Sequence, residues 1–152
     1  MNRIVVSDSA CLIGLERVQR LELLAAVFGE VIIPPMVAAE FGVSLPWLKV
    51  IAPRDLHLVA ACRAVVDDGE AEAIALAAEL GAEVLLDDLR GRRLAARLNV
   101  PARGLLGVLV LAKQMGKLVA VAPVISELRR QNFFISAPLV AEVLGRCGET
   151  MD

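Results

Sequence analysis

The stretch GEAEAIALAAELGAEVLLDD, residues 69–88, contains the unit from which the fold can be predicted. Its first part repeats alanine and isoleucine at helical spacing and ends at Gly81, a residue type that commonly terminates helices. The apolar run EVLL, residues 83–86, follows directly and has the length of a buried strand. A helix that leads at once into a buried strand is typical of a sheet with parallel strands.

The same alternation extends over the rest of the chain. Short runs rich in valine and isoleucine predict strands at residues 3–7, 31–34, 49–53, 83–86 and 118–122. Segments of helical period predict further helices at residues 12–28 (one or two helices), 36–41, 87–98, 104–116 and 123–131. The tail, residues 132–145, predicts an extended piece or short strand and a last helix. The pattern therefore predicts an α/β fold with a mostly parallel sheet of about five strands.

Length and composition predict a single domain over residues 1–152. Of these 152 residues 57% are hydrophobic and 3% aromatic, and there is no linker or low-complexity tract. A net charge of −2 excludes the broad basic surface of a general nucleic-acid binder, so any contact with nucleic acid is expected to be local. The scarcity of aromatic residues disfavours base stacking as the main binding route.

The ends and the cysteines of the chain bear on where it works. It begins MNRIVVSD, without the long apolar core of a signal peptide, and its longest apolar runs are too short to span a bilayer. Cys11, Cys62 and Cys147 form no C-x-x-C pair, so we expect reduced thiols. These features predict a cytoplasmic protein with no membrane contact.

Acidic residues follow the predicted strands or begin the predicted helices. Asp8 follows the first strand, Asp87 and Asp88 follow the EVLL strand, Glu70 heads a helix, and Glu40 lies in the helix after the second strand. Each has a structural alternative: the aspartates are favoured helix caps, Glu70 suits a helix N-terminus, and Glu40 suits a solvated face.

The set is more informative than its members. Ligands bind at the carboxyl ends of parallel strands, and acids gathered there repel one another unless a cation lies among them. Carboxylates without histidine or cysteine favour Mg²⁺ or Mn²⁺. A single histidine, His57, and dispersed cysteines cannot form a zinc site of the usual kind, and His57 is expected in a surface loop.

Four pieces of the sequence resemble the PIN-domain family, and within it the compact VapC-like proteins often found beside small antitoxins. They are VVSDSACLIGL, VIIPPMVAAEF, DDGEAEAIALAAELG and VLLDDLRGRRLA, and the later GLLGVLVLAKQMGKL is also similar. The resemblance implies a three-layer α/β/α domain. It also implies that the family's acids correspond to Asp8, Glu40, Glu70 and Asp88, with Glu72 and Asp87 left open as alternatives to the last two.

The activity implied by this resemblance is that of a metal-dependent endoribonuclease. One or two Mg²⁺ or Mn²⁺ ions would supply the electrophile and activate water, so no histidine or serine nucleophile is needed. The implied partners are RNA, a small antitoxin and a second copy in a homodimer.

Contacts to RNA are expected beside the last acid. Arg90, Arg92 and Arg93, with Arg97 in the same helix, can hold phosphates, and Ser9 is a further candidate. The arginines are equally compatible with a solvated helix face or a docking surface for a protein. Arg103 and Lys113 are weaker candidates.

Three positions depart from the family pattern. Glu70 stands where aspartate is usual, Leu86 where many members have threonine, and Ala10 where many have a polar residue, a loss that Ser9 compensates in part. These changes support a second interpretation, a catalytically weak module that binds metal, RNA or an antitoxin. A phosphatase or receiver fits poorly, because Asp8-Ser9-Ala10 breaks the D-x-D spacing and Ala122-Pro123 replaces the lysine of a receiver.

Overall fold

The computed structural model describes residues 4–151. Within this range one sheet contains five short strands: β1 Val5–Ser7, β2 Val31–Ile33, β3 Leu48–Val50, β4 Glu83–Leu85 and β5 Ala102–Arg103. Every pairing is parallel, and the strand order is β3-β2-β1-β4-β5. The predicted α/β class with a parallel sheet is confirmed.

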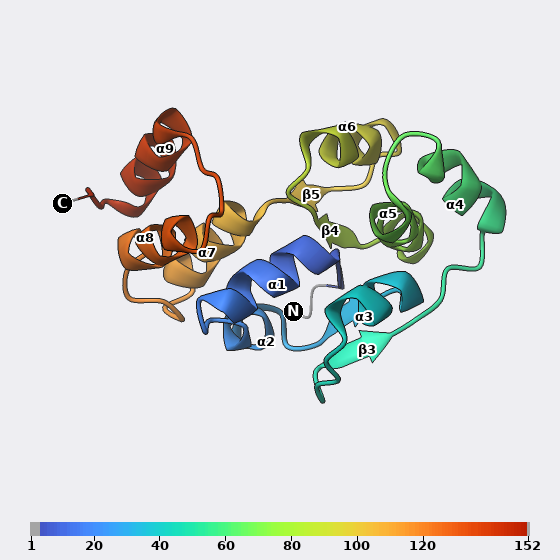
Figure 1. The fold of residues 1–152 in the computed structure, drawn as a ribbon, viewed down its shortest axis with the longest axis horizontal. Coiled ribbons are helices and arrows are strands. Elements are labelled where there is room, and N and C mark those ends of the chain that lie inside the picture. Colours follow the sequence, from blue (N-terminus) through green and yellow to red (C-terminus); the bar gives the residue numbers. More distant parts are fainter. Residues whose placement is uncertain (1–3, 152) are drawn as a thin grey trace.

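Helices occupy most of the remaining chain. Their bounds are α1 Ser9–Arg17, α2 Glu22–Phe28, α3 Pro35–Phe41, α4 Leu56–Arg63, α5 Asp68–Leu80, α6 Leu89–Arg97, α7 Leu105–Gln114, α8 Ala122–Arg130 and α9 Ala137–Cys147. Figure 1 shows α7, α8 and α9 gathered at the end of the molecule that carries the C-terminus. None of the helices in the described part is long and apolar enough to cross a membrane.

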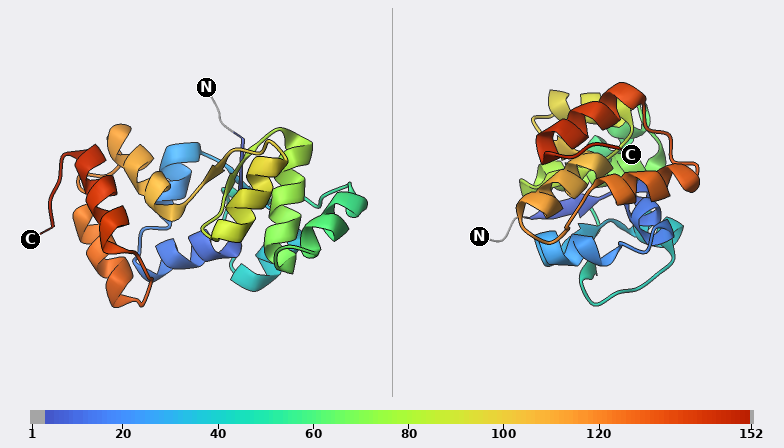
Figure 2. Two further views of the ribbon diagram at one scale, coloured as in Figure 1. Left: turned by 90° about the horizontal axis from the view of Figure 1, so that it is seen from above. Right: turned by 90° about the vertical axis from the view of Figure 1, so that its left-hand side faces the viewer.

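The sheet separates two apolar cores, and consecutive residues of β1 face opposite cores. Val5 packs into a core with α1, α2, α3, α7, α8 and α9, whereas Val6 packs into a core with α5 and α6, to which α4 adds Cys62. Side chains alternate along a strand, so an unbroken apolar strand requires helices on both faces. The predicted three-layer α/β/α architecture is confirmed, and Figure 2 shows helices on both sides of the strands.

The strand predicted at residues 118–122 is wrong. This segment is a turn that leads into α8, with Val119 95% exposed beside the buried Leu118 and Val121. The amides of Val121 and Ala122 do not pair with a strand but donate to the Glu149 carboxylate at 2.9–3.1 Å. The fifth strand is instead Ala102–Arg103, which has only two residues and lacks a valine-rich signature.

One further expectation is corrected in detail. His57 is exposed, as expected, but it lies in α4 and not in a loop. This short helix has a capping aspartate, Asp55, and buries only Val59 and Cys62. Of the two forms predicted before α9, the structure has the extended piece, which pairs with no strand of the sheet.

Candidate metal centre at the carboxyl end of the sheet

The centre of the sheet places two predicted acids side by side. The chain leaves β1 toward β2 and β3 on one side and returns as β4 and β5 on the other, so the order reverses between β1 and β4. Crevices for ligands form at such reversals, outside the carboxyl ends of the strands. Asp8 directly follows β1, Asp87 lies two residues beyond β4, and the Asp8 amide donates to the Leu85 carbonyl at 3.0 Å.

Asp8 combines a capping role with burial. Its Oδ1 accepts the Cys11 amide at 3.0 Å and begins α1, so the N-cap interpretation is correct. The residue is only 4% exposed. Burial raises the pKa of the Asp8 carboxyl to about 7; the Cys11 amide opposes this rise, and the charges of Asp87 and Asp67 add to it. Capping and a place in an acidic site therefore coexist in one side chain.

Glu70 lies in the first turn of α5 and reaches toward α6. Burial raises the pKa of its carboxyl to about 8, and a hydrogen bond with Asp67 and the charges of Asp67, Asp88 and Asp8 contribute in the same direction. Its Oε2 is buried and has no hydrogen-bond partner. A buried carboxylate oxygen without a partner is costly unless a cation compensates it.

Asp87 and Asp88 diverge although they are neighbours in sequence. Asp88 caps α6, and its Oδ2 accepts the Gly91 amide at 3.1 Å. Asp87 Oδ1 accepts the Leu105 amide at 2.8 Å at the start of α7, while its Oδ2 is buried without a partner. Burial raises the Asp87 pKa, against the effects of the Leu105 amide and the Arg92 charge. Each aspartate thus fixes a different helix.

Glu40 lies at the edge of this group. It is in the last turn of α3, and its carboxylate lies against the bare backbone of Gly69, where a β-carbon would collide with it. Burial raises the Glu40 pKa, the charges of Asp67, Asp68 and Glu72 add to the rise, and a hydrogen bond from Ser9 lowers it. Ser9, predicted to contact RNA, therefore contacts a predicted metal ligand.

Asp67 is an acid that the sequence interpretation did not single out. It caps α5 by accepting the Glu70 amide at 2.9 Å, and its charge acts on Asp8, Glu40 and Glu70. The acidic start of DDGE was its signal in the sequence. Glu72, the alternative to Glu70, has structural contacts instead: it accepts the Met36 amide at 3.2 Å and lies 3.7 Å from Arg63.

The donor chemistry of this group suits a hard divalent ion. In the described range 4–151, no three His, Cys, Asp or Glu side chains form a ready metal-binding group, so the structure does not bring these acids together around one ion position. Two of them nevertheless carry the unpartnered buried oxygens, Glu70 Oε2 and Asp87 Oδ2. Carboxylate oxygens of this kind fit Mg²⁺ or Mn²⁺.

The arginines of α6 are divided between two sides of the site. Arg90 and Arg93 line a cleft of about 690 Å³ with Glu70 and Asp88, and Arg63 of α4 joins them there. Arg92 lines a different groove with Asp87. Arg90 and Arg93 therefore face a different opening from Arg92.

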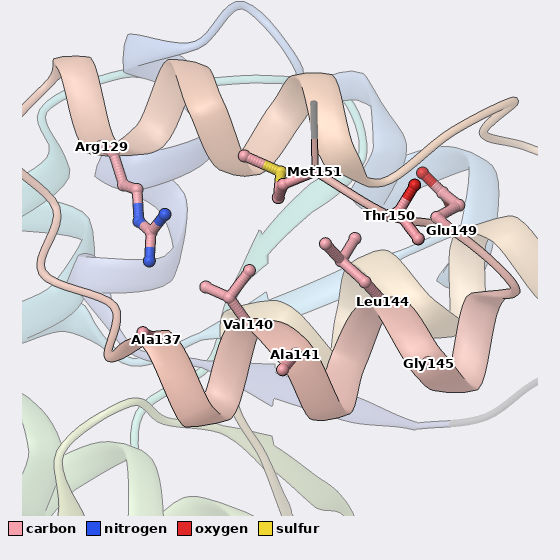
Figure 3. Close-up of a pocket in the computed structure, with 9 residues that line it drawn as sticks. All are labelled: Arg129, Ala137, Val140, Ala141, Leu144, Gly145, Glu149, Thr150 and Met151. Carbon is pink, nitrogen blue, oxygen red and sulfur yellow. The ribbon is translucent and has the colours of Figure 1, made fainter.

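An apolar cavity of about 550 Å³ lies elsewhere, between α8, α9 and the C-terminal segment. Figure 3 shows Val140 and Leu144 in its wall, with Arg129 and Glu149 toward opposite ends. Both charged groups are engaged, because Arg129 donates to the Ile135 carbonyl and Glu149 accepts from Lys113 at 2.6 Å. This cavity shares no residue with the acidic region.

The chain was also compared with known proteins. A family model described as a PIN domain matches residues 4–149. No curated protein matches the chain significantly. The matched range includes every acid and every arginine described above.

Proposed function

Because the chain belongs to the PIN-domain family, a family of nuclease-type domains that typically bind divalent metal ions, we propose that it is a metal-dependent endoribonuclease. The proposed ligands are Asp8, Glu40, Glu70 and Asp88, as the resemblance implied, with Asp87 as a fifth. The resemblance alone supports the finer roles of a toxin paired with an antitoxin, of a homodimer and of a cytoplasmic location.

The pair of unpartnered buried oxygens carries this proposal. Glu70 Oε2 and Asp87 Oδ2 come from different helix starts, and both lack a hydrogen-bond donor. Removing such oxygens from water without compensation opposes folding. The fold keeps them at the carboxyl end of the sheet, where Asp8 adds a third buried carboxyl. A divalent cation bound at this end of the sheet would compensate carboxylates of this kind.

When bound, such an ion polarises the scissile phosphate and lowers the pKa of water. The chain's own groups would do the rest. The Leu105 and Gly91 amides fix the carboxylates of Asp87 and Asp88, so these oxygens are held in place before substrate arrives. Arg90 and Arg93 lie beside Glu70 and Asp88 and would hold a substrate phosphate next to them.

Two departures from the family pattern now have a physical context. The longer Glu70 fits because Gly91 has no side chain where the Glu70 carboxylate lies. Leu86 is fully buried in the core that contains α5 and α6, so it offers no polar group to the site. The second observation favours the alternative proposal, a catalytically weak PIN-like module that binds metal, RNA or an antitoxin.

Cleavage of a mixed, partly single-stranded RNA by the purified protein separates the two proposals. We expect cleavage with Mg²⁺ or Mn²⁺ that EDTA and Asp8→Asn abolish. Asn keeps the cap of α1, so Asp8→Asn tests the charge and not the helix. Asp55→Asn, at the cap of α4, is the matched control and should cut like the wild type. A folded protein that binds metal but cuts no RNA with either ion supports the binding module.

A further inference from the structure

A groove of about 550 Å³ continues from the acidic region on the side away from Glu70. Its near end includes Asp87 and Arg92, and its far wall is the segment of residues 133–136 together with one face of α9 that extends to Arg146 in the last turn. It shares no lining residue with the cleft of Arg90 and Arg93. The N-terminal end of α6 therefore separates the cleft of Arg90 and Arg93 from this groove. A polymer that enters through the cleft and crosses the carboxylates would leave through the groove.

Positive charge lines this groove. Arg92, Arg103 and Arg146 contribute three cations against the two carboxylates of Asp87 and Glu142. Arg103 is paired with Glu83 at 3.0 Å, but Arg92 and Arg146 take part in none of the ion pairs formed within residues 4–151. Two arginines on opposite walls are thus available to anionic groups of a ligand.

An aromatic side chain projects at the far wall. Phe134 is 89% exposed, whereas Ile135 is buried and Phe133 lies against Gly14 and Leu105. The extended backbone alternates its side chains, so anchoring Phe133 and Ile135 turns Phe134 outward. Phe134 and Arg146 line the same groove. An exposed aromatic ring beside unpaired arginines has the composition of a stacking platform for a single-stranded nucleic acid.

The floor of the groove is kept open by Gly104 at the start of α7. A β-carbon at residue 104 would lie 3.0 Å from Asp87 Oδ1 and 3.2 Å from Arg92 Nη1. A side chain at residue 104 would therefore crowd both the acid and the arginine. A phosphate reaching Arg92 passes next to Asp87, which connects the groove to the acidic region.

We propose that this groove binds the unpaired strand on one side of the cleaved bond, with a base stacked on Phe134 and phosphates held by Arg92 and Arg146. The inference rests on the proposed nuclease function and adds a substrate requirement: several unpaired nucleotides beyond the scissile phosphate. Stacking tolerates every base, so Phe134 selects for strandedness and not for sequence.

Binding is measured with the Asp8→Asn protein and Mg²⁺, so that the probe is not cut. The probe is a fluorescent, unstructured RNA of about ten nucleotides, a length that suits a groove of this kind. In this background Phe134→Leu and Phe134→Ala should weaken binding about tenfold, and Phe134→Tyr should bind like the parent. Val119→Ala, at another highly exposed apolar residue, is the control and should have no effect. Phe134→Ala should not change the affinity for a duplex of equal length.

Salt dependence separates the arginines from the ring. Arg146→Ala should reduce the slope of log affinity against log salt by about 0.7, the value for one phosphate contact on a single strand. Arg20→Ala, at an exposed arginine of the α1–α2 turn, and Phe134→Ala should leave this slope unchanged.

Equal affinity of the Ala, Leu and Tyr variants at position 134, or no binding of the single strand by the parent, overturns the proposal. So does a parent dimer that Phe134→Ala converts to a monomer in sedimentation with unchanged RNA affinity, because Phe134 would then be a contact between copies. If the groove variants behave as expected but the wild type cuts no RNA, the nuclease proposal fails and the groove stands. If the wild type cuts RNA and the Phe134 variants bind normally, the groove proposal fails and the nuclease proposal stands.

Discussion

Glu70 and Gly91 are matched in shape across α5 and α6. A β-carbon at residue 91 would lie 2.7 Å from Glu70 Oε2 and 2.9 Å from Cδ2 of the buried Leu86, closer than real β-carbons approach other atoms. Glycine lowers the stability of a helix interior by about 1 kcal/mol relative to alanine. Its presence in α6 is therefore explained by the space that the Glu70 carboxylate occupies.

Gly91→Ala is predicted to displace the Glu70 carboxylate. We expect the affinity for Mn²⁺, measured by calorimetry, to fall about tenfold or more, as for other changes that misplace metal ligands. The control is Gly145→Ala in α9, where a β-carbon meets nothing within 4 Å. That variant should gain about 1 kcal/mol of stability and keep its metal affinity. Equal metal affinity in both variants would contradict the role assigned to Gly91.

Asp67→Asn is predicted to weaken metal binding without unfolding the protein. Asparagine keeps the cap of α5, but the change removes the charge that acts on Asp8, Glu40 and Glu70. We expect the Mn²⁺ affinity to fall about tenfold and the melting temperature in EDTA to stay the same or rise. Asp55→Asn, at the equivalent cap of α4, should change neither property. If the two variants bind metal equally well, Asp67 is only a cap.

The metal-free protein is predicted to lose stability as pH rises. Burial raises the pKa of Asp8 to about 7 and that of Glu70 to about 8, above their ordinary values of 3.8 and 4.5. The folded state then holds more protons than the unfolded state, so the free energy of unfolding falls between about pH 4 and pH 8. Urea denaturation in EDTA at pH 5 and pH 8 should show a loss of about 2 kcal/mol, with a smaller loss in Asp8→Asn.

Metal should reverse this pH dependence. Ligand carboxylates must be deprotonated, so ion binding releases protons and the affinity for Mn²⁺ should increase from pH 6 to about pH 8. At pH 8 a saturating ion should restore the stability that EDTA removes. A metal-free protein that becomes more stable from pH 5 to pH 8 would show that these carboxyls are not proton-bound in the folded state.

Glu149→Ala is predicted to destabilise the C-terminal part of the fold. Burial would raise the Glu149 pKa, but hydrogen bonds from Lys113 and from the Val121 and Ala122 amides outweigh it and lower that pKa. The change removes these charge-assisted hydrogen bonds and leaves the amides at the start of α8 without their acceptor. The free energy of unfolding, measured by urea denaturation, should therefore fall by about 2 kcal/mol. Glu149→Gln should lie between the wild type and the alanine variant. Glu16→Ala, at an exposed residue, is the control and should not change the free energy of unfolding. An equally small effect of Glu149→Ala would contradict the stabilising role assigned to Glu149.

The stabilising effect of Glu149 should disappear in acid. A carboxyl with a lowered folded pKa stabilises the fold above its ordinary value of 4.5, and this contribution is lost as pH falls below it. The stability difference between Glu149→Gln and the wild type should therefore shrink below about pH 4.

The strands that carry the acids could be predicted because their signals are local. Val5–Ser7 and Glu83–Leu85 are apolar runs followed by aspartates, and parallel strands bring such ends together. Ala102–Arg103 carries no such signal, since its pairing depends on the neighbouring β4 and not on its own residues. Leu118–Ala122 has the composition of a strand, but Glu149, distant in sequence, takes its amides.

The directions of side chains at the site could not be predicted from spacing. Asp87 and Asp88 are adjacent, yet Asp87 fixes the start of α7 and Asp88 caps α6. The arginines of α6 also point to different sides, since Arg92 lines one opening and Arg90 and Arg93 line the other. These directions depend on how α6 and α7 pack on the sheet. The fit of Gly91 to Glu70 is likewise a tertiary contact that an isolated helix pattern does not contain.

The alternation at β1 sets a limit on how this gene can change in length. Val5 belongs to one core and Val6 to the other, and Asp8 follows two positions later. Deleting one codon between Val5 and Asp8 would exchange the two faces and carry the carboxylate to the wrong layer. Residues 43 and 44, in the turn between α3 and β3, are exposed and have no such constraint. We therefore expect related genes to gain and lose codons at that turn while the spacing from β1 to Asp8 stays fixed.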